Sequence, residues 1–144
     1  MMKYPEWFKK GRIIKCPLDW PREKKKYCII LGYDVSKGEI LIALINSKIS
    51  KFIQDNSYLR ELQVELKRAD YPEIFSKTTS YVDCSVVRRK DLNILIEELE
   101  NGLAKDCSNL KQDDKELIFS NVLNCIDIKT KDKLYIRSIL PRVR

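Results

Sequence analysis

The sequence predicts an α+β domain in which about five short strands, forming a small β-barrel or a curled sheet, precede C-terminal helices. Two observations support this class. Five β-prone segments separated by turn signals lie before residue 90, and segments with helical apolar spacing come after it. At 144 residues the chain can bury one core without disulfides or a structural metal. We therefore expect one domain over residues 1–144, barrel-like over 8–89 and mainly helical over 90–144.

The predicted strands are residues 11–16, 27–33, 39–45, 62–66 and 78–84. Pro17 ends the first strand. The second and third strands are continuous apolar runs, typical of strands covered on both faces, and Lys37-Gly38 supplies a turn between them. This pattern therefore predicts a hairpin over residues 26–45. The fourth strand alternates apolar with polar residues, as a half-exposed strand does, and a long irregular loop separates it from the fifth.

Two helices and an ambiguous tail follow the strands. Asp91 can cap a helix whose apolar residues recur at i, i+3, i+4 and i+7. These residues are Leu92, Leu95, Ile96 and Leu99. We expect a second helix over about residues 113–124, where Asp113 and Glu116 are spaced like a capping box. The tail, residues 131–140, fits either a strand or a helix.

The positive charge of the chain is concentrated near its N-terminus. The formal net charge is +7, and residues 1–52 hold 12 Lys/Arg against 5 Asp/Glu, whereas residues 53–144 hold 16 of each. A local excess of this kind attracts polyanions, above all nucleic acid, and an acidic protein partner would satisfy it equally well. A solvated surface that keeps a small protein soluble is the simplest alternative.

The residue types exclude several kinds of site. The chain has no histidine, so Ser-His-Asp and Cys-His catalysis and the usual zinc sites cannot be assembled. The five cysteines form no C-x-x-C pair, and Cys16, Cys28 and Cys125 lie in apolar runs where a small buried hydrophobe is expected. We therefore expect no metal and no cofactor. Acid–base chemistry would have to use Lys, Arg, Tyr or carboxylates.

No apolar stretch approaches the roughly 18 residues that a membrane span needs. The first residues, Met1-Met2-Lys3-Tyr4-Pro5-Glu6, are polar and do not form the apolar core of a secretory signal. These features predict no membrane partner and a cytoplasmic location.

Four segments carry a resemblance to a known family. They are an opening strand, a basic loop leading into an apolar strand, the polar end of the next strand, and a strand before a helix: Gly11-Arg12-Ile13-Ile14, Lys25-Lys26-Tyr27-Cys28-Ile29-Ile30-Leu31, Ile42-Ala43-Leu44-Ile45-Asn46-Ser47-Lys48 and Ser80-Tyr81-Val82-Asp83-Cys84-Ser85-Val86-Val87-Arg88. Over roughly residues 8–100 their order resembles that of the PemK/MazF toxins. The chain departs from the family at Lys26-Tyr27, where Arg-Pro is usual, and at Asn46, where threonine is frequent.

The resemblance implies an SH3-like barrel decorated with helices. It also implies a metal-independent endoribonuclease that cleaves single-stranded RNA, is neutralised by an antitoxin protein and forms a homodimer. The alternative is a catalytically inactive barrel that acts as a nucleic-acid-binding or protein-interaction module.

Cleaving RNA without a metal requires proton transfer at the 2′-hydroxyl and the leaving 5′-oxygen, and cations for the phosphorane charge. The candidate catalytic residues are Arg22, Lys26 and Ser47. Arg22 or Lys26 would hold the phosphate and assist proton transfer, with Arg22 preferred for its planar fork, and Ser47 would donate to a nonbridging oxygen. The candidate RNA-binding residues are Arg12, Trp20, Lys24, Lys25, Tyr27, Asn46 and Lys48. We expect residues 22–26 and 46–48 to converge in one groove.

Several of these residues also have a purely structural interpretation. The lysine run at 24–26 is typical of a solvated surface, and Ser47 after a buried strand is typical of a turn. Trp20 can be either a lid over the core or a stacking platform for a base. Convergence of the basic loop with the end of the hairpin distinguishes a site from these alternatives.

Overall fold

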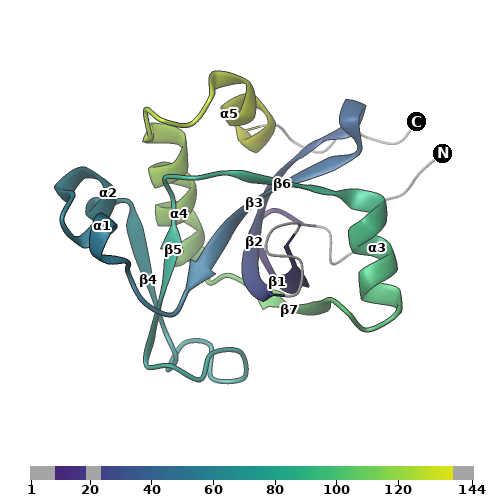
Figure 1. Cartoon of the computed structure of the whole chain (residues 1–144), viewed down its shortest axis with the longest axis horizontal. Coiled ribbons are helices and arrows are strands. Elements are labelled where there is room, and N and C mark those ends of the chain that lie inside the picture. The colour runs from purple at the N-terminus through teal and green to yellow at the C-terminus, as the bar shows by residue number, and fades with distance from the viewer. Residues whose placement is uncertain (1–8, 19–23, 138–144) are drawn as a thin grey trace.

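The computed structural model describes residues 9–18 and 24–137 of the chain. The sequence-based expectations for Trp20 and Arg22 therefore lie outside the described residues. Within the described part the protein is α+β, because a curled antiparallel sheet carries helices on both faces (Figure 1). This observation confirms the predicted class.

The described strands are β1 (Arg12–Pro17), β2 (Lys25–Asp34), β3 (Glu39–Asn46), β4 (Gln63–Lys67), β5 (Thr79–Asp83), β6 (Arg88–Asp91) and β7 (Lys105–Asn109). They pair in the order β4-β5-β3-β2-β1-β7, and β6 pairs with β3. The third strand changes partner along its length, since residues 39–42 pair with β6 whereas Ile45 and Asn46 pair with β5. In the described part of the chain the edge strands β4 and β7 do not pair with each other, so the curled sheet is an open half-barrel.

The described helices are α1 (Lys51–Gln54), α2 (Ser57–Glu61), α3 (Leu92–Glu100), α4 (Gln112–Asn124) and α5 (Thr130–Arg137). Helix α3 has the predicted cap, because the Asp91 carboxylate accepts a 3.0 Å hydrogen bond from the Ile94 amide. The capping box predicted for α4 is wrong. Lys111 occupies the N-cap without a side-chain bond, and Asp113 lies in the first turn, where its charge favours the helix dipole. The ambiguous tail is helical as far as Arg137.

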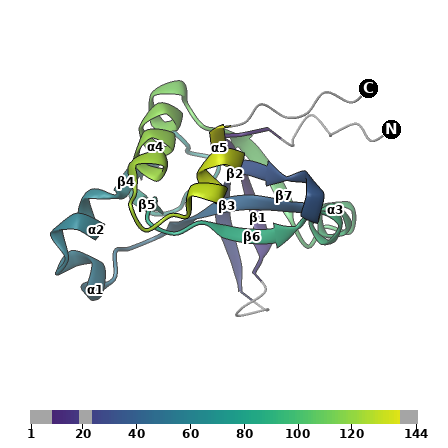
Figure 2. The ribbon, with the colours of Figure 1, turned by 90° about the horizontal axis from the view of Figure 1, so that it is seen from above.

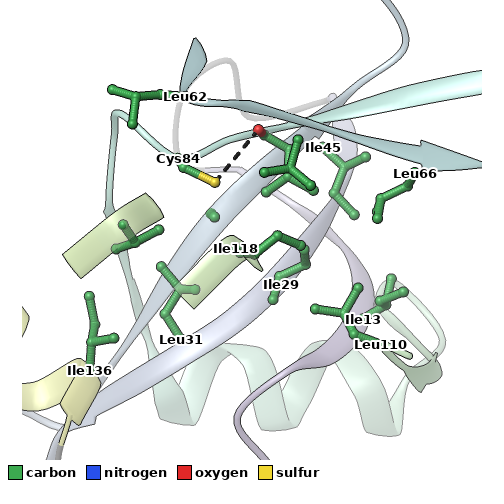
Figure 3. Packing of buried hydrophobic residues seen from close by; sticks show 14 of the residues in the cluster. Ile13, Ile29, Leu31, Ile45, Leu62, Leu66, Cys84, Leu110, Ile118 and Ile136 are labelled. Carbon is green, nitrogen blue, oxygen red and sulfur yellow. Dashed lines mark hydrogen bonds between the residues drawn. The ribbon is translucent and has the colours of Figure 1, made fainter. Parts of the chain in front are cut away.

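Two apolar cores lie on opposite faces of the sheet. The larger packs under α4 and α5 and includes Ile13, Ile29, Leu31, Ile118 and Ile136 (Figure 3). The smaller packs under α3 and includes Ile14, Cys28, Ile30 and Leu95. Figure 2 shows α3 and α4 at well-separated sides of the sheet. Because successive residues of β2 point to opposite faces, its continuous apolar run supplies both cores, which confirms the prediction of a strand covered twice.

The predicted hairpin is formed by β2 and β3 and closes through a 3₁₀ turn, η1 (Val35–Lys37). Gly38 follows that turn with φ of 62°, a conformation that glycine adopts without steric cost. Gly32 serves a different purpose. A Cβ added there would lie 2.7 Å from the Tyr135 carbonyl oxygen, so glycine allows α5 to approach β2.

The prediction of about five strands is too low for this sheet, because β6 and β7 were not predicted. Their sequences, Arg88-Arg89-Lys90-Asp91 and Lys105-Asp106-Cys107-Ser108-Asn109, have no apolar alternation. Both pair along only one described neighbour, and such polar edge strands are recognised by their partners rather than by their own pattern. The short helices α1 and α2 were missed for a similar reason, since neither has a buried residue.

Four cysteines are buried, namely Cys16, Cys28, Cys84 and Cys125, and none of the five forms a disulfide. This confirms the expectation of small buried hydrophobes at Cys16, Cys28 and Cys125. In a search limited to the described residues, no helix combines the length and the apolar character needed to cross a bilayer.

Candidate functional site

A groove of about 260 Å³ lies where β2 begins and β3 ends. We call it the basic groove. Its lining residues are Lys15, Lys24, Lys25, Lys26, Tyr27, Ile45, Asn46, Ser47, Phe75, Ser76, Lys77 and Ser80. Among the described residues five lysines and no carboxylate line it, so the groove concentrates positive charge with no internal neutralisation.

The hairpin register brings the two predicted segments together. Tyr27 of β2 pairs with Ile45 of β3. Lys26 precedes Tyr27 on β2 and Asn46 follows Ile45 on β3, and the Lys26 ammonium donates a 2.6 Å hydrogen bond to the Asn46 side-chain oxygen. The basic loop and the polar end of the hairpin therefore face one space, as the sequence predicted for these segments.

Contacts with neighbouring residues hold the Tyr27 side chain in place in this groove. Its hydroxyl donates a 2.9 Å hydrogen bond to the Ile74 carbonyl, and its ring meets that of Phe75 edge-to-face with centroids 5.4 Å apart. Lys15, its register partner on β1, places its ammonium 4.9 Å from the Tyr27 ring centroid. An aromatic ring fixed on three sides gives the groove a rigid wall beside its lysines.

The ammonium of Lys26 differs from that of an ordinary surface lysine. Burial lowers its pKa, and the charges of Lys24 and Arg88 lower it further, against an opposing effect of Cys28. A lysine whose pKa moves towards neutrality exchanges a proton more readily at physiological pH. Lys26 is therefore a candidate for proton transfer in the groove.

The structure brings six of the predicted site residues into the basic groove: Lys24, Lys25, Lys26, Tyr27, Asn46 and Ser47. Lys48 is exposed after β3 and does not line the groove. Arg12 does not line the groove either. Its Nε lies 2.6 Å from Asp106 Oδ1, so it joins β1 to β7, and its pKa is raised chiefly by that hydrogen bond. The assignments of Trp20 and Arg22 lie outside the described part of the chain.

Sequence reasoning missed Lys15 and the loop residues Phe75, Ser76 and Lys77, which complete the groove. Lys15 could have been found by aligning the first predicted strand antiparallel to the second, since it pairs with Tyr27. The loop between β4 and β5 has no periodicity, and only the folded sheet brings it against the hairpin.

Chemically, the groove can bind a phosphodiester through its lysines and donate hydrogen bonds from Ser47 and Lys26 to phosphate oxygens. The residues described by the structure contain no group of three or more Cys, Asp or Glu side chains placed to hold a metal ion. No protein-family model matches the sequence, and no curated protein matches it.

Proposed function

We propose that the chain binds single-stranded RNA in the basic groove and cleaves it without a metal, as a PemK/MazF-like toxin of the SH3-like barrel type. The observation that carries this proposal is the composition of the groove: five described lysines, a fixed aromatic ring and no carboxylate in one concave site. Phosphate attraction combined with an aromatic wall suits a flexible, unpaired strand whose bases can leave the stack. The assignment to the PemK/MazF family is proposed from the resemblance over residues 8–100.

The cleavage step uses the RNA's own nucleophile. The 2′-hydroxyl attacks phosphorus, the bond to the 5′-oxygen breaks, and the products are a 2′,3′-cyclic phosphate and a free 5′-hydroxyl. One proton leaves the 2′-oxygen and one is taken up by the 5′-oxygen. Lys26, with its lowered pKa, transfers a proton at one of these oxygens, and Ser47 donates a hydrogen bond to a nonbridging oxygen.

The partners follow from the same proposal. An antitoxin that neutralises this protein would place an acidic segment in the basic groove, because carboxylates satisfy the same lysines as phosphates. The homodimer is implied by the family resemblance and is proposed with it, whereas the cytoplasmic location stays a prediction from the sequence.

A binding module without catalysis is the second candidate. Lysines occupy the described groove where the family uses an arginine, and a lysine holds phosphate as a point charge without the planar fork of a guanidinium. The hydrogen bond from Lys26 to Asn46 also uses one of its three donors. RNA retained intact in the groove would support this candidate.

RNA binding can be tested by fluorescence anisotropy with a mixed-sequence single-stranded RNA at several salt concentrations. We expect affinity to fall steeply with salt, and Lys26→Gln to weaken binding several-fold. Lys37→Gln is the matched control, because Lys37 is an exposed lysine in η1, at the far end of the same hairpin. Binding that is insensitive to salt, or equally weakened by both substitutions, would contradict the proposal.

A further inference from the structure

A second cavity, of about 320 Å³, shares Tyr27 as a lining residue with the basic groove. We call it the Tyr27 pocket. Its lining residues are Tyr27, Asp70, Tyr71, Pro72, Glu73, Ile74, Lys105, Cys107 and Ser108. Tyr27 lines both spaces, so the two cavities meet at one residue. The volume lies at the lower end of ligand sites and suits a group the size of a nucleobase.

The two cavities are neighbours along the chain as well as in space. In the loop between β4 and β5, residues 70–74 line the Tyr27 pocket and residues 75–77 line the basic groove. Across the sheet, Lys105 of β7 pairs with Lys15 of β1, which pairs with Tyr27. Directly opposed residues share a face of the sheet, so a ligand could reach from one cavity into the other past this row.

The chemistry of the Tyr27 pocket differs from that of the groove. It is lined by two carboxylates, Asp70 and Glu73, and by one lysine, Lys105, together with Cys107, Ser108 and aromatic and aliphatic surface. The Asp70 carboxylate accepts from the Lys111 ammonium at 3.0 Å. Glu73 makes no hydrogen bond or ion pair with any described residue, so its two oxygens remain to accept from a ligand.

The Tyr71 hydroxyl is already hydrogen-bonded within the protein. This hydroxyl donates to the Asp114 carboxylate and accepts a 2.9 Å hydrogen bond from the Lys111 amide. Burial and the bond to Asp114 raise the pKa of Tyr71, which keeps the phenol protonated. Tyr71 therefore supplies shape to the pocket, and Glu73 supplies the acceptor that can recognise a base.

We propose that the Tyr27 pocket binds a guanine base of the RNA whose backbone occupies the basic groove, with the Glu73 carboxylate accepting from guanine N1–H and N2–H. The inference rests on the proposed RNA-binding function and adds base selectivity to it. Guanine alone among the four bases presents two adjacent donors on its Watson–Crick edge. Adenine and cytosine present an amino group beside an acceptor nitrogen, and uracil presents one N–H between two carbonyls that a carboxylate repels.

The selectivity can be tested with four uridine-rich heptamers that differ only in a central G, A, C or U. The wild-type chain should bind the G heptamer about tenfold more tightly than the others, as expected for one bidentate pair. Glu73→Gln should abolish most of this preference. Glu65→Gln should retain it, since Glu65 is an exposed glutamate on β4 outside both cavities.

A chemical probe in the pocket gives an independent readout. Cys107 lines the Tyr27 pocket and is the one cysteine of the five that is not buried. Burial raises the pKa of its thiol, so alkylation with iodoacetamide should be followed at about pH 9. Guanosine monophosphate should slow alkylation of Cys107, and uridine monophosphate should not.

The outcomes separate this inference from the function on which it rests. Equal, salt-sensitive binding of all four heptamers, without protection of Cys107, would overturn the guanine pocket and leave the basic groove intact. A preference for A, C or U would also overturn it. Binding of none of the RNAs would overturn both the pocket and the proposed function.

Discussion

The Lys26 ammonium donates a 2.6 Å hydrogen bond to the side-chain oxygen of Asn46, which joins the start of β2 to the end of β3 inside one groove. The bond holds a cation with a lowered pKa at the centre of a cluster of lysines. Changes to either partner or to its charged neighbours should therefore alter RNA binding and proton transfer in directions that can be stated in advance.

Asn46→Asp should weaken RNA binding by about fivefold, because a carboxylate beside Lys26 adds a negative charge, and interactions between solvent-exposed charges are worth up to about 1 kcal/mol. Asn46→Ser keeps the position neutral and should change affinity much less. Anisotropy titrations of both variants at one low salt concentration measure the effect. Equal affinities for the two variants would mean that the RNA backbone does not pass Asn46.

Lys24→Gln should raise the pKa of Lys26, since the Lys24 charge is one cause of its lowering and burial is the larger one. Acetylation of Lys26 by acetic anhydride, followed by mass spectrometry as a function of pH, should then require a higher pH. The alkaline limb of any cleavage profile should shift in the same direction. Lys37→Gln, far along the hairpin, should leave the acetylation profile of Lys26 unchanged.

Lys15→Gln should reduce the slope of log affinity against log salt by about 0.7, the contribution of one phosphate contact on a single strand. Lys15 lines the basic groove and places its ammonium 4.9 Å from the Tyr27 ring centroid. An unchanged slope would show that Lys15 serves the aromatic ring alone.

Arg89 connects three carboxylates away from the groove, and through Asp34 it should contribute to the stability of the fold in acid. Its guanidinium lies 2.8 Å from buried Asp34, 3.1 Å from Glu39 and 2.6 Å from Asp132 of α5. Burial alone raises the pKa of Asp34, but hydrogen bonds from Arg89, Ser36 and the Lys37 amide lower it to about 2.

Because the folded pKa of Asp34 lies below its ordinary value of 3.8, its contribution to stability is complete above about pH 4 and is lost as the pH falls towards 2. Arg89→Met should cost about 3 kcal/mol at neutral pH by leaving Asp34 buried without its cation. The pH dependence of stability should also reverse its direction in this variant. Burial then raises the pKa of Asp34, so protonation at low pH stabilises the variant. Urea unfolding of both proteins between about pH 3 and pH 7 measures the reversal, and parallel curves would contradict it.

The apolar pattern was sufficient to predict the sheet wherever a strand buries apolar residues. The hairpin, the half-exposed strand at Gln63–Lys67 and the helix capped by Asp91 all follow from periodicity and local caps. Strands β6 and β7 have sequences without apolar alternation, and their positions depend on β3 and β1. Pairing of this kind cannot be deduced from a segment taken alone.

The part of the site that lies on the predicted hairpin could be predicted from the sequence, and the rest could not. Lys24, Lys25 and Lys26 converge with Asn46 and Ser47 because a hairpin brings its two ends together, and that hairpin was clear in the sequence. Lys77 and Glu73 come from an irregular loop whose place against Tyr27 depends on packing by Phe75 and on the bond to Ile74. The ion pair between Arg12 and Asp106 likewise required knowledge of β7.

The most direct test is to incubate the purified chain with a mixed-sequence single-stranded RNA in excess chelator and to analyse the ends of the products. The account predicts fragments with 2′,3′-cyclic phosphate and 5′-hydroxyl ends. Lys26→Gln should lower their rate of formation by about a hundredfold or more, and Lys37→Gln should leave it unchanged. Intact RNA in chelator with the wild-type chain, or equal cleavage by the wild type and Lys26→Gln, would contradict it.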